Sequence, residues 1–392
     1  MDFTLSDEDR MLKDLVARFV REELLPLERV ILEREAVGQG TFLTPEERAP
    51  IDKKARELGL WALDAPEEFG GANLSFLSLT GVYEELAKTV VPIILGPDSP
   101  NLRMLMITVS DQQREKYLAP YSRGETLCAM AISEPAAGAD PAAMTTRAEK
   151  RGDDWILNGR KIWISKAAEA DFTILMAVTD KSKGARGGIS AFLIDKDTPG
   201  FKVLRKIQML AGMFTYEVAL EDCRLPASQL LGREGDGFGP MQVRLSTRRL
   251  EMACSCIGMA QRALDMMCEY APQRVTFGQP LSERQTIQWW VADAATKIHA
   301  CRLMAYDLAV KLDRLRGNGG RDARVELSMI KVFATEMAWE ILDHAMQTFG
   351  AMGMTKEVPL QLMASLVRNM RVYEGPSEVH RWVIARKLLR LR

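Results

Sequence analysis

The first third of the chain shows the spacing of apolar residues that is typical of amphipathic helices. One helix is expected from Ser6 onward, because Ser6 and Asp9 have the spacing of a capping box. Thr44, Pro45 and Glu47 mark a second start, with a cap, a proline in the first turn and an acid three residues after the cap. The same periodicity predicts two further helices, over Ser75–Lys88 and Asp111–Tyr117.

Between about Thr126 and Ala227 the pattern changes to short apolar or alternating runs, which are typical of β-strands. The expected strands are LCAMAIS, WILNGRKIWIS, DFTILMAVTD, GISAFLID and FKVLRKI, separated by glycine, aspartate and proline. Gly152, Asp153 and Asp154 predict a hairpin turn before the second of these strands. Several short strands at this spacing indicate a small β-barrel or sandwich.

From about Pro240 to the end the chain is helical again. Long helices are expected over Ser246–Tyr270, Ser282–Arg316 and Arg324–Thr348, each well above the usual ~11–12 residues. Ser282 and Gln285 have the spacing of a capping box, and Gly317–Gly320 is expected to end the second long helix. Long antiparallel helices of this kind predict a four-helix bundle.

These patterns of apolar and polar residues divide the chain into three parts. Gly232, Gly235, Gly237 and Gly239 predict a hinge-like linker between the last two, and their spacing is not that of a dinucleotide-binding loop. The expected fold class is α+β and mainly helical. We expect an N-terminal helical domain over residues 1–125, a middle β-barrel or sandwich domain over 126–235, and a C-terminal helical bundle domain over 236–392.

Composition narrows the class of function by exclusion. The 392 residues carry a net charge of −1, so no electrostatic field draws the chain to nucleic acid or anionic lipid. No apolar run approaches the ~18 residues of a membrane span. The six cysteines include no CxxC pair, and the three histidines are dispersed, so no metal site is expected. The first residues carry early acids and no apolar leader, and we expect a soluble protein of the reducing cytoplasm.

Glu374 is the strongest candidate for chemistry. It lies in the stretch RNMRVYEGPSEVHRWVIARKLL, between an expected helix over Pro359–Met370 and a second helix that starts near Pro376. Gly375 allows another group to approach the backbone closely. A carboxylate held in such a connection can point into a cleft. The apolar neighbours Met370, Val372 and Tyr373 predict a partly desolvated carboxylate, which is suited to act as a base.

Several ordered motifs resemble those of the acyl-CoA dehydrogenase family of flavoproteins, and the match runs essentially end to end. They are SEPAAGAD, NGRKIWIS, GMAQRALD with QRVTFGQPLSERQ, QTFGAMG and RVYEGPSEVHR. The resemblance implies an FAD-dependent enzyme that removes a proton from the α-carbon of an acyl-CoA and transfers a hydride from the β-carbon to flavin N5. It places Glu374 at the family's catalytic base. It also implies that the backbone N–H of this residue donates to the thioester carbonyl.

The resemblance further assigns contacts to the cofactor and the substrate. Arg274 and Phe277 match positions that reach the FAD of a neighbouring subunit, and Arg274 would pair with the pyrophosphate. The full set implied for FAD is Ile132, Ser133, Gly138, Trp163, Ser165, Arg274, Phe277, Gln285, Gln347 and Gly350, with Gly353 also allowing close approach. The set implied for the substrate is Ala139, Arg249, Tyr373 and Gly375.

Some positions depart from the family pattern. Ala139 stands where the family usually has serine or threonine, Ser246 replaces a common aspartate, and Ala351 replaces a glycine. Pro376 and Glu378 replace a common threonine and glutamine, as in a bacterial branch that shares EGPSEVHR. The segment from Gly96 to Asn101 is expected to rim the acyl pocket. The length, branching or ring character of the acyl group does not follow from the sequence.

Two other functions remain open on the same fold. One is a flavin oxidase or monooxygenase that uses O₂, and the other is a non-catalytic subunit that supports an active partner chain. The presence of Glu374 and Arg274 favours the dehydrogenase. We therefore expect an acyl-CoA substrate, an electron-transfer flavoprotein as acceptor, and a homo-oligomer, either a tetramer or a dimer.

Overall fold

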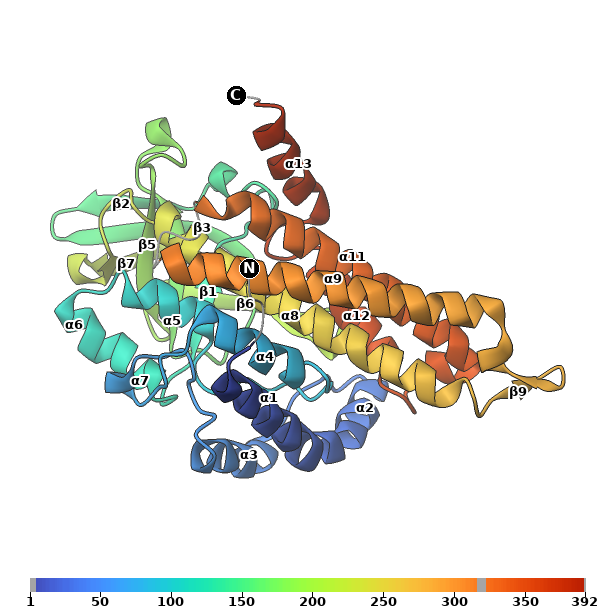
Figure 1. Ribbon diagram of the computed structural model, residues 1–392. Coiled ribbons are helices and arrows are strands. Elements are labelled where there is room, and N and C mark those ends of the chain that lie inside the picture. Colours follow the sequence, from blue (N-terminus) through green and yellow to red (C-terminus); the bar gives the residue numbers. More distant parts are fainter. Residues whose placement is uncertain (1–4, 316–321, 391–392) are drawn as a thin grey trace.

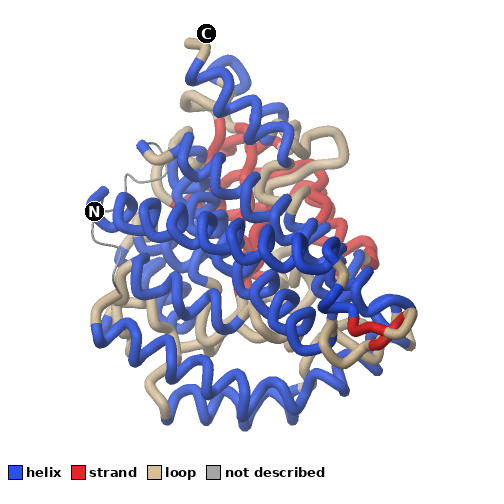
Figure 2. Tube along the Cα trace, turned by 45° about the vertical axis from the view of Figure 1, so that its right-hand side comes forward, coloured by secondary structure: helices blue, strands red, loops and turns tan. Residues whose placement is uncertain are grey.

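The computed structural model describes residues 5–315 and 322–390. Helices form the two ends of the chain and a sheet forms the middle, as Figures 1 and 2 show. The N-terminal helices are α1 (Asp7–Phe19), α2 (Glu28–Ala36), α3 (Pro45–Glu57), α4 (Phe76–Leu86), α5 (Ser99–Met106), α6 (Asp111–Gln113) and α7 (Ala119–Ser122). The predicted starts hold: the Asp9 N–H donates to the Ser6 hydroxyl, and Thr44 and Glu47 form a reciprocal capping box.

The middle of the chain is one curved sheet in which two groups of strands meet. Its strands are β1 (Cys128–Ala131), β2 (Arg147–Arg151), β3 (Asp154–Ile164), β4 (Phe172–Val178), β5 (Ile189–Asp195), β6 (Phe201–Gln208), β7 (Phe214–Pro226) and β8 (Leu230–Leu231). The order is β6-β7-β3-β2-β4-β5-β8, with β1 also paired to β4. Strands β2 and β4 pair only at Arg147 and Val178, so the sheet is close to two small sheets joined at one edge.

The longest strand, β7, is absent from the strands predicted from sequence. It pairs with both β3 and β6 and completes the buried face of the sheet. Residues 215–220 of β7 are all buried, and every second residue, Tyr216, Val218 and Leu220, belongs to the core of the sheet. Glu217 and Glu221 obscured the alternation, although Glu217 pairs with Arg205 on the neighbouring strand.

Among the described residues, the C-terminal part contains three long helices and two shorter ones. They are α8 (Phe238–Tyr270), α9 (Gln285–Leu315), α11 (Arg324–Phe349), α12 (Leu360–Met370) and α13 (Ser377–Leu388). A two-stranded hairpin, β9 (Val275–Thr276) and β10 (Gln279–Pro280), projects between α8 and α9 (Figure 1). Helix α9 begins at Gln285 itself, so the predicted capping box of Ser282 and Gln285 is wrong. The predicted stop at Gly317–Gly320 lies outside the described residues.

The glycine-rich segment before α8 is packed tightly, which differs from the expected hinge. The Gly235 N–H donates to the Ser190 hydroxyl, and the Gly237 N–H donates to the Ile189 carbonyl. A Cβ atom at Gly235 would lie 2.3 Å from the carbonyl oxygen of Gly187. These glycines therefore serve close contact with β5. Helix α8 starts at Phe238, eight residues before the predicted Ser246, and Gly239 lies inside it.

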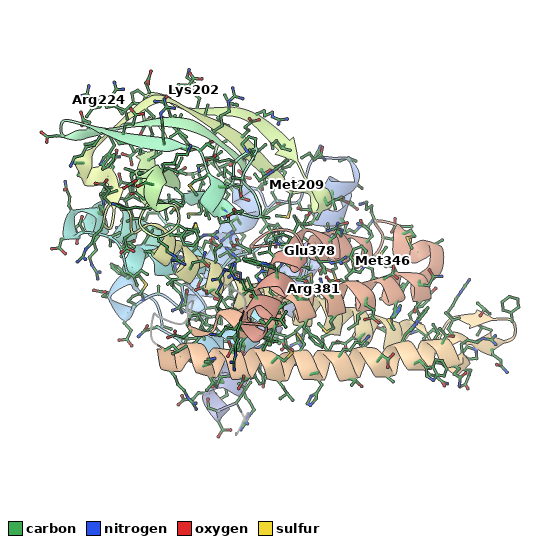
Figure 3. All side chains as sticks on the ribbon, turned by 90° about the horizontal axis from the view of Figure 1, so that it is seen from above. Lys202, Met209, Arg224, Met346, Glu378 and Arg381 are labelled. Atoms are coloured by element: carbon green, nitrogen blue, oxygen red, sulfur yellow. The ribbon has the colours of Figure 1, made fainter. Side chains whose placement is uncertain are left out.

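One hydrophobic core joins the two helical ends of the chain. It contains Val16 of α1, Leu79 of α4, Ile257 of α8, Leu308 of α9 and Ile341 of α11. The sheet has its own core around Trp155 and Phe192, whose rings meet edge to face at 5.4 Å. Figure 3, viewed from above, shows the sheet with Lys202 and Arg224 on its outer edge, beside the long helices. The site described next lies where these helices come together.

Candidate active site

Glu374 lies in the short connection between α12 and α13, in a left-handed backbone conformation with φ 57°. Gly375 follows with φ 94°, a region that glycine alone adopts without strain. A Cβ atom at Gly375 would also lie 2.9 Å from Nε2 of His380. The backbone turns sharply here, and that turn sends the Glu374 side chain back toward the interior instead of along α13.

The side chains of Arg249, His380 and Lys331 donate hydrogen bonds to the backbone carbonyl oxygens of this turn. Arg249 Nε donates to the Glu374 carbonyl at 3.1 Å, and His380 Nε2 donates to the same oxygen at 3.2 Å. Lys331 Nζ donates to the Gly375 carbonyl at 2.6 Å. Among the described residues, the backbone N–H of Glu374 has no hydrogen-bond acceptor. The turn is therefore fixed on its carbonyl side and leaves one donor available.

Burial and the repulsion between like charges lower the pKa values of these three side chains. Burial, together with the charge of Arg249 nearby, lowers the pKa of Lys331 to about 8. Burial, with the charges of Arg249 and Lys331, lowers the pKa of His380 to about 3. Burial lowers the pKa of Arg249 to about 10. His380 is thus neutral at pH 7, with Nε2 as the donor to Glu374 and Nδ1 3.0 Å from the Ser328 hydroxyl.

The carboxylate of Glu374 faces an arginine. Nη1 of Arg244 lies 3.0 and 3.2 Å from the two carboxylate oxygens, and both side chains are largely buried. Arg244 Nε donates to Asn101 Oδ1 at 2.9 Å. The Glu374 side chain is only 13% exposed, although its neighbours Val372 and Tyr373 are 56% and 37% exposed. The contact that the carboxylate makes is with a guanidinium.

A second group of charged side chains in the site consists of Arg248, Glu251 and Asp98. Arg248 donates to Glu251 at 2.8 Å and forms a short contact with Asp98, which belongs to the segment expected to rim the acyl pocket. Burial raises the pKa of Glu251 to about 7, although Arg248 opposes this. Burial alone would raise the pKa of Asp98, but Arg248 and Arg244 hold it below its ordinary value. This end of the site is polar.

The structure brings the two sheet motifs together. The Ile162 N–H donates to the Ser133 carbonyl at 2.9 Å, and Lys161 Nζ donates to the Ile132 carbonyl at 3.0 Å. Trp163 has φ 63° and is 49% exposed, and Ser165 two residues on is also exposed. Gly138 and Ala139 lie in an exposed turn after Ser133, where a Cβ on Gly138 would meet no atom within 4 Å. An exposed indole, an exposed serine two residues further on and an open turn fit a planar polar ligand.

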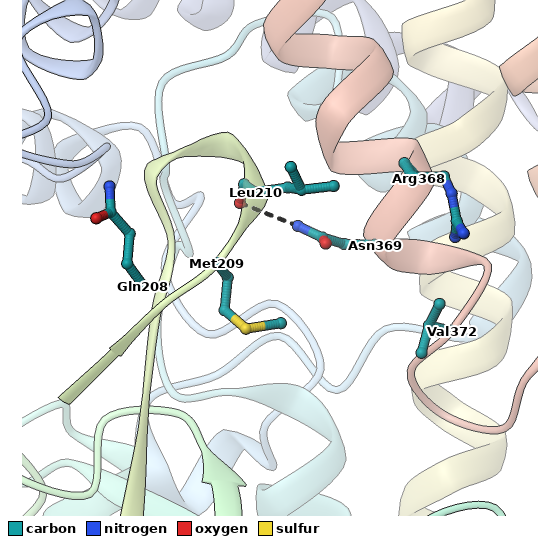
Figure 4. Close-up of a pocket in the computed structure, with 6 residues that line it drawn as sticks. All are labelled: Gln208, Met209, Leu210, Arg368, Asn369 and Val372. Atoms are coloured by element: carbon teal, nitrogen blue, oxygen red, sulfur yellow. Dashed lines mark hydrogen bonds between the residues drawn. The ribbon is translucent and has the colours of Figure 1, made fainter. Parts of the chain in front are cut away.

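The sheet meets the Glu374 segment at the β6–β7 turn. Asn369 Nδ2 at the end of α12 donates to the Leu210 carbonyl at 3.1 Å (Figure 4). Around this bond is a pocket of about 620 Å³, lined by Gln208, Met209, Leu210, Arg368, Asn369 and Val372. Val372, which lines this pocket, is two residues before Glu374 in the sequence, so the pocket lies next to the Glu374 segment at the junction of sheet and helix.

The remaining residues expected at the cofactor lie elsewhere in the chain. Arg274 and Phe277 are on the projecting hairpin, where Phe277 is fully exposed with φ 51°. Gln285, Gln347 and Gly350 are exposed near the same end, where Phe349 stacks on Tyr270 at 4.1 Å. Gly353 has a packing reason of its own, because a Cβ there would lie 2.4 Å from the Met346 carbonyl.

Helix α11 runs from the Glu374 turn to the end of α8 next to the hairpin, so its length gives the separation of these two places. Its Lys331 contacts Gly375 near one end, and its Phe349 contacts Tyr270 at the other. Eighteen residues of helix correspond to roughly 27 Å. Within one chain, the cofactor residues expected on and near the hairpin therefore lie at the far end of α11 from the Glu374 turn.

Sequence reasoning missed the residues Arg244, Lys331 and His380, which contact the Glu374 turn directly. Arg244 fell between the predicted linker, which ends at Gly239, and the helix that was expected to begin only at Ser246. Lys331 lies mid-helix, where a lysine is ordinarily solvent-exposed. His380 was considered only as a metal ligand, although its place six residues after Glu374, one turn into the expected helix, was a usable signal.

Other kinds of site find no support in the described part of the chain. No group of three or more histidine, cysteine, aspartate or glutamate side chains there could hold a metal ion. All six cysteines are unpaired. No helix among the described residues is long and apolar enough to cross a membrane.

Comparison with known proteins identifies the family. Models of the acyl-CoA dehydrogenase N-terminal, middle and C-terminal domains match residues 6–125, 129–223 and 235–389. The (R)-benzylsuccinyl-CoA dehydrogenase of Thauera aromatica is 41% identical, over 99% of this chain and 97% of that protein.

Two solved structures agree in fold. The butyryl-CoA dehydrogenase of Megasphaera elsdenii has a TM-score of 0.87 at 32% identity, covering 99% of this chain and 100% of that one. A glutaryl-CoA dehydrogenase from Mycobacterium smegmatis in complex with FADH2 has a TM-score of 0.84 at 26% identity, covering 98% and 95%. The chain belongs to the acyl-CoA dehydrogenase family, and it is an oxidoreductase that acts on CH–CH groups.

Proposed function

We propose that this protein is an FAD-dependent acyl-CoA dehydrogenase that introduces an α,β double bond into an acyl-CoA thioester, with Glu374 as the base. The observation that carries the proposal is the turn at Glu374. Its left-handed backbone turns a largely buried carboxylate inward, and Arg249, His380 and Lys331 fix the turn by its carbonyl oxygens. A carboxylate fixed by its backbone can meet a reacting carbon in one orientation.

FAD fits the residues on the sheet side of the site. Trp163 offers an exposed indole, Ser133 and Ser165 offer hydroxyls, and the turn with Ile132 on one side and Gly138 on the other leaves open space. When bound, FAD supplies the acceptor for the hydride. Arg274, Phe277, Gln285, Gln347 and Gly350 lie too far along the helices to share one cofactor with this set in the same chain. We propose that they complete the site of a neighbouring copy.

The protein's own groups divide the remaining work. Glu374 accepts the α-proton of the acyl group, and its backbone N–H donates to the thioester carbonyl, where negative charge develops. Tyr373, Gly375 and Ala139 border the acyl-CoA. Arg249 fixes the turn through its hydrogen bond to the Glu374 carbonyl. Donors fixed before the reaction stabilise the developing charge without reorganisation, and they are the larger share of such catalysis.

The partners follow from the same proposal. We propose a homo-oligomer, either a tetramer or a dimer, that passes its electrons to an electron-transfer flavoprotein and works in the cytoplasm. The relatives named above act on benzylsuccinyl-, butyryl- and glutaryl-CoA, so an acyl-CoA is the substrate class.

The test is a panel of acyl-CoAs assayed with an artificial electron acceptor. We expect yellow protein with non-covalent FAD, bleaching on anaerobic addition of a suitable acyl-CoA, and little oxygen consumption in air. Protein that takes up no FAD on reconstitution would contradict the cofactor assignment. Stoichiometric oxygen uptake would indicate an oxidase or monooxygenase, and FAD binding without turnover on any acyl-CoA would indicate a supporting subunit.

A further inference from the structure

Helix α8 carries two arginines into the site that face the same side. Arg244 and Arg248 are four residues apart, the spacing that places side chains on one face of a helix. Their side chains are 10% and 19% exposed. Neither residue belongs to the set that the family resemblance assigns. Two buried guanidinium groups at the end of an acyl-binding site require an explanation from charge.

The two arginines differ in their partners. Arg248 contacts two carboxylates, Asp98 and Glu251. Arg244 has one carboxylate within ion-pair distance in the described part of the chain, and that carboxylate is Glu374 itself. Its other contact is the neutral amide of Asn101, whose Nδ2 in turn lies 3.4 Å from the Cys128 carbonyl. Among the described residues, the proposed base is therefore the one carboxylate in direct contact with Arg244, and Asp98, which Arg244 also affects, is already paired with Arg248.

This pairing conflicts with a base that accepts a proton. When Glu374 takes the α-proton it becomes neutral, and Arg244 is left buried without a carboxylate in direct contact. A buried charge without a counter-ion is strongly unfavourable. A fatty acyl chain would make matters worse, because it would displace water from Arg244, Arg248 and Asp98 without offering any hydrogen bond. A second anion from the substrate resolves both difficulties.

We propose that the acyl group carries a carboxylate, and that Arg244 binds it in place of Glu374. The substrate class is the monothioester of a short dicarboxylic acid. The substrate carboxylate pairs with Arg244 beside Asn101, and Glu374 is released toward the α-carbon. The inference rests on the proposed function, since it concerns the acyl-CoA of that reaction. It makes Arg244 a substrate-binding residue that also prevents Glu374 from reacting before the correct substrate arrives.

The first test needs no variant. Succinyl-, glutaryl- and adipyl-CoA are compared with their own monomethyl esters, which have the same chain and no charge. The readout is the rate of anaerobic flavin bleaching against concentration. At the preferred length we expect the acid to exceed its ester by about 10²-fold in the ratio of bleaching rate to Kd, as for a buried, hydrogen-bonded charge pair.

The outcomes are distinct. If every ester, and butyryl-CoA, reacts as well as the matching acid, the inference is overturned and the proposed function stands. If no acyl-CoA of any kind bleaches the flavin, the proposed function itself fails, and the inference with it.

The second test changes the arginine. In Arg244→Gln the preference for acid over ester should fall by about 10²-fold toward unity, whereas Arg244→Lys should retain part of it. The matched control is Arg262→Gln, because Arg262 is on the same helix and pairs with Glu28 through two nitrogens away from the site. The control should lose stability and keep the preference. A full preference in a folded Arg244→Gln protein would overturn the assignment to Arg244. If that variant does not fold, the acid and ester comparison on the unchanged protein still decides.

Discussion

The turn at Glu374 depends on a neutral histidine. The His380 ring is 2% exposed, donates from Nε2 to the Glu374 carbonyl, and lies between two cations, Arg249 and Lys331. Protonation would place a third positive charge in this buried group of side chains, beside Arg249 and Lys331. The histidine therefore positions the base and requires the neutral form to do so.

This requirement predicts an acid-sensitive fold. His380 has a folded-state pKa lowered to about 3 from an ordinary 6.5, so the unfolded chain binds more protons between these values. Its contribution to stability is complete above pH 6.5 and is lost as the pH falls toward 3. Between pH 7 and pH 5 this amounts to about 2 kcal/mol.

The measurement is urea unfolding at pH 7 and pH 5. His380→Gln is expected to show a smaller loss on acidification than the unchanged protein by that amount. His299→Gln, at an exposed site on α9, serves as the control and should behave as the unchanged protein does. Equal acid sensitivity of the His380 variant and the unchanged protein would show that this ring does not resist protonation.

At the scale of elements, the cofactor side of the site depends on one buried ion pair. Lys161 of β3 is fully buried and lies 2.9 Å from Glu134, which also accepts from the Thr145 and Thr146 N–H groups. Burial lowers the pKa of Lys161 to about 8, whereas Lys161 and Thr146 lower that of Glu134 to about 2 despite its burial. This pair holds the Ser133 segment against the strand that carries Trp163.

Removing one partner of that pair leaves a buried charge. Lys161→Met is expected to cost about 3–5 kcal/mol of stability and to reduce FAD content. In the double variant Glu134→Gln/Lys161→Met part of this loss should be recovered. The control is Lys202→Met, because Lys202 pairs with Glu221 on the outer edge of the sheet with both side chains more than half exposed (Figure 3). Its cost should be below about 1 kcal/mol, as measured by urea midpoints. A stable, fully yellow Lys161→Met protein would refute the role of the pair.

Element-scale patterns in the sequence predicted most of the fold. Thr44 with Glu47, the Gly152 turn and the long apolar helices are local signals, so the helix starts and the hairpin were found. The site was harder, because Arg244, Lys331 and His380 come from three helices and act only through tertiary contact with one turn. Strand β7 was missed for a related reason: its charged residues are paired across strands, which a single strand does not reveal.

At the scale of the whole molecule, we propose that the expected cofactor residues form one site only when two chains associate. Trp163 and Ser165 lie on the sheet, whereas Arg274 and Phe277 lie on a hairpin that projects beyond α8 and α9 (Figure 1). Phe277, at the end of this projection, is fully exposed in the single chain. Packing of the hairpin against a second copy would bury it and bring Arg274 to the other chain's cofactor.

Mixing two defective variants tests this arrangement. Arg274→Ala and Trp163→Ala are each expected to bind FAD at least about 10-fold more weakly, because one loses a charge-assisted phosphate contact and the other a ring contact. In random hybrids of a two-fold assembly, roughly a quarter of sites would combine the intact halves of both chains. FAD titration after unfolding and reassembly of the mixture should reveal these tight sites. Their absence, or a monomer that binds FAD fully, would show that one chain forms the whole site.

The central claim is that Glu374 accepts the α-proton, and its most direct test is stopped-flow bleaching of the flavin by saturating acyl-CoA in Glu374→Gln. The amide has similar volume but cannot take the proton, so the rate should fall by roughly 10²–10⁴-fold while FAD remains bound. Glu378→Gln, an exposed glutamate on α13 close to the turn (Figure 3), is the control and should bleach at the unchanged rate. If Glu374→Gln bleached within a few-fold of the unchanged protein, Glu374 would be a structural partner of Arg244, and the base would lie on another segment.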